Sequence, residues 1–116
     1  MIIEALQSGS LPEFRNLLDE ARGKAGELPL TDGQFTALCH AVRGNELEIY
    51  VARENQELAG FTAAATWFSL SSCRYEAAPR GRYIRPEFQG CGLEERLEEY
   101  LADALKIRGL SLSGGC

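Results

Sequence analysis

Two glycines, Gly90 and Gly92, lie between a short strand-like segment that ends at Pro86 and a strongly periodic helical segment. The N-terminus of a helix carries unpaired backbone N–H groups and the positive end of the helix dipole. Glycines let a ligand approach that backbone closely, so this order of elements suits a phosphate group. A plain turn with a glycine cap is the simpler explanation of a Gly-x-Gly pair, and the third glycine of a dinucleotide-binding loop is missing. The two glycines by themselves leave both interpretations open.

The residues around this loop resemble a known family. The sequence of residues 83–109 is YIRPEFQGCGLEERLEEYLADALKIRG, which closely resembles the acetyl-CoA-binding motif of the GNAT superfamily of N-acetyltransferases. In that motif an apolar strand and an x-Pro-Glu step precede (Gln/Arg)-x-x-Gly-x-(Gly/Ala), which opens a long helix. Upstream, residues 2–21 resemble the first strand and helix of the family, and residues 47–65 resemble its strand hairpin. The resemblance covers nearly the whole chain in the order of the family.

The resemblance implies acetyl-CoA as the co-substrate and an amine as the acetyl acceptor. It places six loop residues around the CoA pyrophosphate, namely Gln89, Gly90, Cys91, Gly92, Leu93 and Glu94. It places three strand residues along the pantetheine arm, namely Tyr83, Ile84 and Arg85. In the family the strand binds this arm through its main chain.

Three departures from the family pattern leave two functions open. Glu94 stands where the family has a small residue, and residues 79–82 interrupt the expected strand with Pro-Arg-Gly-Arg. The sequence ends at LSLSGGC, so the next helix of the family and its last two strands are lacking, with the tyrosine that usually protonates the CoA thiolate. The first function is an active N-acetyltransferase that acts on a small amine or a protein amine. The alternative is a degenerate, non-catalytic module that binds acyl-CoA or another protein.

Acetyl transfer requires a base that deprotonates the amine, an oxyanion donor and an acid for the departing thiolate. Glu76 is a candidate base, since the family often uses an acidic residue in that region, and Tyr83 is a candidate proton donor. A solvated loop carboxylate and a half-buried strand tyrosine are the simpler interpretations of these two residues. Glu94 is expected to repel a bound pyrophosphate unless its side chain turns into water or Arg85 or Arg96 neutralises it.

The composition excludes several other functions. The 116 residues carry a net charge of −5, so the basic face of a nucleic-acid-binding protein is missing. No stretch approaches the ~18 apolar residues of a membrane span, and the N-terminus lacks the features of a signal peptide. We therefore expect a cytoplasmic protein with no nucleic-acid or membrane partner. Four scattered cysteines and the single His40 offer no usual set of metal ligands.

The sequence predicts one domain over residues 1–116, apparently incomplete at its C-terminus. Residues 1–6 form a predicted strand. A helix follows, with Ser10 as N-cap, Glu13 at the capping-box position and Gly23 at its end. A second helix is capped by Thr31 or Asp32.

The period then changes to that of strands, with an antiparallel hairpin formed by residues 47–54 and 58–70. We expect a loop through Cys73 and Pro79 before a short strand at 81–85, a helix at about 92–108 and a last strand that begins at Leu110. The fold class is therefore α/β, a mixed sheet flanked by helices in the order β-α-α-β-β-β-α-β. The uncovered last strand and the apolar face of the last helix predict a homodimer.

Overall fold

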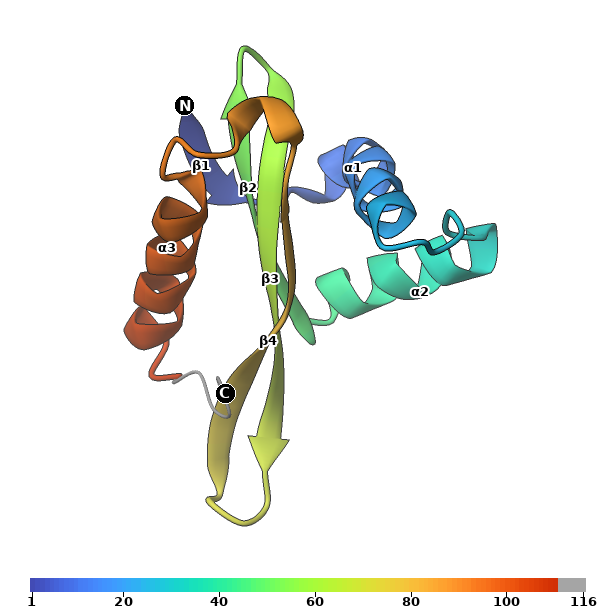
Figure 1. The fold of residues 1–116 in the computed structure, drawn as a ribbon. Helices are drawn as coiled ribbons and strands as arrows, with labels where there is room; N and C mark the ends of the chain where they lie inside the picture. Colours follow the sequence, from blue (N-terminus) through green and yellow to red (C-terminus); the bar gives the residue numbers. More distant parts are fainter. Residues whose placement is uncertain (111–116) are drawn as a thin grey trace.

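The computed structural model describes residues 1–110, in which a four-stranded sheet has helices on both faces (Figure 1). The strands lie in the order β1-β2-β3-β4, and their bounds are Ile2–Ala5, Leu47–Glu54, Glu57–Ser69 and Arg74–Ile84. Helices α1 (Leu11–Lys24) and α2 (Asp32–Arg43) cover one face, and α3 (Leu93–Ile107) covers the other. Two single turns of 3-10 helix, Ser8–Ser10 and Pro86–Phe88, precede α1 and α3.

The order of the elements up to α3 agrees with the sequence prediction. All three strand pairings among residues 1–110 are antiparallel. Two neighbouring parallel strands need a long connection between them, usually a helix. The parallel strand of the predicted mixed sheet would therefore come after α3. Apart from Leu110, the predicted last strand lies outside the described residues. The β2–β3 hairpin is confirmed, and its turn residues Asn55 and Gln56 both have positive φ, as a two-residue hairpin turn of type I′ requires.

The loop predicted through Pro79 is wrong, because β4 already begins at Arg74. Pro79 lies opposite Ala64 and Gly81 lies opposite Ala63, so Arg80 is the extra residue of a β-bulge. Within the described sheet β4 is an edge strand, where proline and bulges are tolerated. Strands β3 and β4 therefore form one long hairpin that extends well beyond β2 (Figure 1).

The caps of the first two helices differ from one another. Ser10 is the N-cap residue of α1, as predicted, but its side chain makes no capping hydrogen bond, so the predicted capping box with Glu13 is wrong. Instead the Ser10 hydroxyl accepts a hydrogen bond from Arg53 of β2 at 3.0 Å, and Glu13 forms an ion pair with the same guanidinium. Helix α1 also continues past Gly23 to Lys24. The predicted cap of α2 is confirmed, because Thr31 and Gln34 form a reciprocal capping box.

The core lies on both faces of the sheet, because successive strand residues point to opposite sides. Toward α1, the buried side chains include Phe14, Leu17 and Val51. Toward α3, a stripe with helical spacing faces the sheet and contains Leu93, Leu97, Leu101 and Leu105. Leu93 and Leu97 pack with Ile84 at the end of β4, so α3 is fixed to the sheet from its first residue.

Candidate functional site

The loop between β4 and α3 is held in place at both ends. Ile84 and Leu93, which flank it, are 3% and 2% exposed and pack in one cluster with Phe88. Within the loop, the Gln89 side-chain amide donates to the Ile84 carbonyl oxygen at 3.0 Å. The Cys91 thiol donates to the Phe88 carbonyl oxygen at 2.8 Å. The loop is therefore fixed by buried anchors and by its own hydrogen bonds.

Both loop glycines adopt a conformation that other residues rarely take. The φ angles of Gly90 and Gly92 are +82° and +80°. A Cβ atom at Gly90 would meet nothing within 4 Å, so the backbone angle and not the space explains this glycine. Gly92 is the N-cap residue of α3, and no side chain caps the helix. The first N–H groups of α3 are thus left without a side-chain acceptor, as an anion-binding helix N-terminus requires.

A cavity of about 320 Å³ lies at this uncapped helix end. It is lined by six of the residues that the sequence predicts for the cofactor, namely Ile84, Gln89, Gly90, Gly92, Leu93 and Glu94. Phe88 and Glu95 complete its wall. The predicted residue Cys91 is exposed and is bound to the Phe88 carbonyl.

The two remaining cofactor candidates, Tyr83 and Arg85, point toward α1. The Tyr83 hydroxyl donates to a Glu20 carboxylate oxygen at 2.7 Å. Arg85 Nε lies 3.3 Å from the other oxygen of Glu20 as an ion pair, without the geometry of a hydrogen bond. Burial and the carboxylate of Glu20 raise the pKa of Tyr83 to about 12. Sequence reasoning missed Glu20, which lies 63 residues from its partner and carries no local signal.

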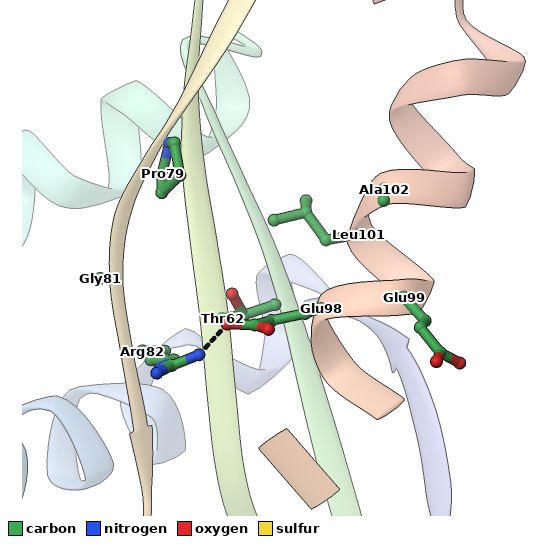
Figure 2. Close-up of a pocket in the computed structure, with 8 residues that line it drawn as sticks. All are labelled: Thr62, Pro79, Gly81, Arg82, Glu98, Glu99, Leu101 and Ala102. Carbon is green, nitrogen blue, oxygen red and sulfur yellow. Dashed lines mark ion pairs between the residues drawn. The ribbon is translucent and has the colours of Figure 1, made fainter. Parts of the chain in front are cut away.

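The carboxylate of Glu94 is paired with an arginine that the sequence prediction did not consider. Arg82 of β4 places Nη2 3.7 Å from Glu94 Oε2, and its Nη1 pairs with Glu98 one turn further along α3. Figure 2 shows the Arg82–Glu98 pair between the strand and the helix. The predicted partner Arg85 instead binds Glu20 on the opposite face of the sheet.

A second cavity, of about 580 Å³, lies between β4 and α3 beside this ion pair (Figure 2). Its wall contains Arg82, Glu98 and Leu101, and the buried Thr62 of β3 contributes a hydroxyl. The loop cavity is lined by α3 residues up to Glu95, and the second cavity begins at Glu98. The two cavities therefore follow one another along α3, with Arg82 at their junction.

Glu76, the candidate base, lies far from the loop. It is opposite Trp67 in the extended part of the β3–β4 hairpin, and Ser72 donates a hydrogen bond of 3.5 Å to its carboxylate. Seven residues of strand separate it from Tyr83, which corresponds to about 23 Å. The structure therefore does not bring the two catalytic candidates together, and their roles stay predictions.

Residues 1–110 contain neither a cluster of metal-binding side chains nor a membrane-spanning helix. No group of three or more His, Cys, Asp or Glu side chains is arranged to hold a metal ion. In the same residues, no helix has the length and apolar character needed to cross a bilayer.

Comparison with solved structures decides the fold. A probable acetyltransferase superimposes with a TM-score of 0.83 at 20% identity, over 97% of this chain and 78% of its own. A predicted acetyltransferase from Clostridium acetobutylicum, solved with acetyl-CoA, gives a TM-score of 0.81 at 14% identity, over 96% and 77% of the two chains. The chain has the GNAT fold.

Other similar structures agree with the GNAT fold. An aminoglycoside acetyltransferase from an uncultured soil metagenomic sample gives a TM-score of 0.82 at 16% identity, over 96% of this chain and 73% of its own. No protein-family model matches the sequence, and no curated protein does. At these identities the similarity establishes the architecture, within which the β4–α3 loop and its two left-handed glycines are the candidate site.

Proposed function

We propose that this chain binds acetyl-CoA at the β4–α3 loop and transfers the acetyl group to an amine. The observation that carries the proposal is the uncapped N-terminus of α3, with Gly90 and Gly92 in left-handed conformation beside a cavity, within a GNAT fold. Backbone N–H groups at such a helix end bind phosphate oxygens without the need for a basic side chain. One structural neighbour was solved with acetyl-CoA, which supports this choice of ligand.

The pantetheine arm would follow β4. Near its loop end, at residues 82–84, β4 pairs with β3 on one side within the described sheet, so outward main-chain groups there can meet the amides of the arm, although the Ile84 carbonyl oxygen already accepts a hydrogen bond from Gln89. Tyr83, Ile84 and Arg85 would contribute through these main-chain groups, and the direction of their side chains does not matter for this contact.

Acetyl transfer then proceeds by attack of a neutral amine on the thioester carbonyl carbon. The tetrahedral intermediate loses one proton from its nitrogen to the base and collapses with cleavage of the C–S bond, and the departing thiolate takes up a proton from the acid. Glu76 and Tyr83 remain the proposed proton-transfer groups. Tyr83 is protonated at neutral pH, as an ordinary tyrosine is, and its hydroxyl donates a hydrogen bond to Glu20.

Calorimetry with acetyl-CoA and CoA, followed by a thiol-release assay, tests the proposal. The amine panel includes an aminoglycoside and a peptide with an N-terminal alanine, since the structural neighbours include an aminoglycoside acetyltransferase and a ribosomal-protein-alanine N-acetyltransferase. We expect micromolar binding and thiol release with at least one amine. Binding without release for any amine would indicate the non-catalytic acyl-CoA-binding module. The absence of binding would refute both the transferase and that module and would leave a protein-binding module.

A further inference from the structure

The first turn of α3 has two carboxylates and yet no side-chain cap. Glu94 and Glu95 both lie in this turn, and the N-cap residue is Gly92, which has no side chain to cap the helix. Acidic side chains near a helix N-terminus are drawn to its free N–H groups by hydrogen bonding and by the helix dipole. A carboxylate that folded back onto these groups would occupy the place proposed for the CoA pyrophosphate. Glu95 already places Oε2 3.6 Å from the point where a Cβ on Gly92 would stand, so the opening that is left at the helix end depends on where the Glu94 carboxylate is held.

Arg82 supplies such a restraint for Glu94. Its guanidinium lies 3.7 Å from Glu94 and also pairs with Glu98, which is one helical turn further from Gly92. Residues four apart share a face of a helix, so one guanidinium pairs with both carboxylates. Arg82 is itself fixed, because its backbone lies in β4 opposite Thr62 of β3. Figure 2 shows the side chain reaching from the strand toward α3.

We propose that Arg82 is a positioning residue of the cofactor loop. By pairing with Glu94 and Glu98 it draws the Glu94 carboxylate along α3 and away from the first N–H groups of the helix, which stay open to a phosphate. This inference rests on the proposed function, since it concerns how the same loop binds CoA.

Two simpler roles of Arg82 give a different result. In a through-space effect, the charges of Arg82 and Glu94 act on the ligand independently of one another. Their side chains are 49% and 53% exposed, so solvent and salt weaken the electrostatic effect of each charge on the ligand. In a direct contact, Arg82 binds a phosphate oxygen itself. In either case, loss of Arg82 costs the same affinity whether or not Glu94 is present. Positioning instead requires that the cost depend on Glu94.

The experiment is a double-mutant cycle with CoA affinity measured by calorimetry at low salt. We expect Arg82→Gln to weaken CoA binding by about tenfold, because the released Glu94 carboxylate would compete with the phosphate for the helix N–H groups. In the Glu94→Gln background the same change should cost less than about twofold. Arg82→Lys should retain most of the affinity. Arg80→Gln is the matched control, because it removes the same charge from the same strand while its guanidinium lies over the Trp67 ring and not at α3.

A ligand-free measurement accompanies the cycle. Amide NMR of the Arg82→Gln protein should show shifts at residues 94 and 95 as the carboxylate caps the helix, and these shifts should be absent in the double variant. Equal costs in both backgrounds, or unchanged affinity in Arg82→Gln, would overturn the positioning role and leave the proposed function standing. Failure of the wild-type chain to bind CoA would overturn the proposed function and this inference with it.

Discussion

The two ends of β4 differ in how much of their structure is determined locally. At the α3 end, the loop geometry follows from residues close in sequence, with Gly90 and Gly92 at positive φ and Leu93 buried against Ile84. At the hairpin end, the strand passes through Pro79 and a bulge while it pairs with β3, and Ala77 packs in a buried cluster with Leu101 and Leu105 of α3. The loop end forms a cavity beside a helix N-terminus, whereas the hairpin end presents exposed side chains such as Tyr75 to solvent. Function is therefore expected at the loop end.

The largest expected effect comes from a charge placed in the loop. Gly92→Asp should abolish measurable CoA binding, a loss of more than about a hundredfold, because a carboxylate at the N-cap accepts the helix N–H groups and repels the pyrophosphate. The protein should stay folded, since aspartate tolerates a left-handed φ better than most residues. Calorimetry and circular dichroism provide the two measurements.

The matched control is Gly92→Asn, which has the same shape without the charge and should bind CoA more tightly than the aspartate variant. At the other end of β4, Glu76→Gln should leave CoA affinity unchanged. Affinity that survives Gly92→Asp in a folded protein would mean that the loop binds no phosphate, and the contrast between the two ends of β4 would disappear.

The sequence predicts the loop end well because its signals are local. Helical periodicity, a glycine pair and a proline stop lie within a few residues of one another, and the loop geometry agrees with them. The prediction for the hairpin end is wrong because a strand accepts a proline such as Pro79 when it lies at the edge of a sheet. The position of β4 at the edge of the described sheet follows from the tertiary structure and not from the local sequence. The same applies to side-chain partners. Ser10 pairs with Arg53, 43 residues away, instead of capping its own helix.

The second prediction concerns self-association through the exposed apolar side chains of α3. Ile107 is 86% exposed and Tyr100 is 41% exposed on this helix, so a homodimer would cover apolar surface that a monomer leaves in water. Sedimentation at tens of micromolar should show a dimer. Ile107→Asp should weaken the association by about tenfold, the effect of losing one well-buried apolar contact. A monomeric wild-type protein at this concentration would refute the prediction.

The third prediction uses the Tyr83–Glu20 hydrogen bond, which ties the loop end of β4 to α1. The pKa of Tyr83 is about 12 in the folded protein, above its ordinary value near 10. Because the pKa is higher in the folded state than in the unfolded state, protonated Tyr83 contributes its full stabilisation of the fold below pH ~10. This contribution is lost as the pH rises from ~10 to ~12. Chemical unfolding as a function of pH should show this loss in the wild type and a flatter profile in Tyr83→Phe. Tyr75→Phe, at the hairpin end, is the control and should retain the wild-type slope.

The smallest expected effect belongs to Glu94, and its sign depends on where the side chain points. A carboxylate in the first turn of a helix stabilises it by about 0.3–1 kcal/mol, while a pyrophosphate at the same helix end is repelled by the like charge. Without a partner for Glu94, Glu94→Ala would tighten CoA binding by roughly three- to a hundredfold. Because Arg82 already pairs with Glu94 at 3.7 Å, we expect the lower end of that range, about threefold, with a small decrease in melting temperature.

Glu98→Ala, which removes the other partner of Arg82 from outside the loop cavity, should change the affinity less. Weaker binding in the Glu94→Ala protein at low salt would mean that the carboxylate assists the ligand instead of repelling it.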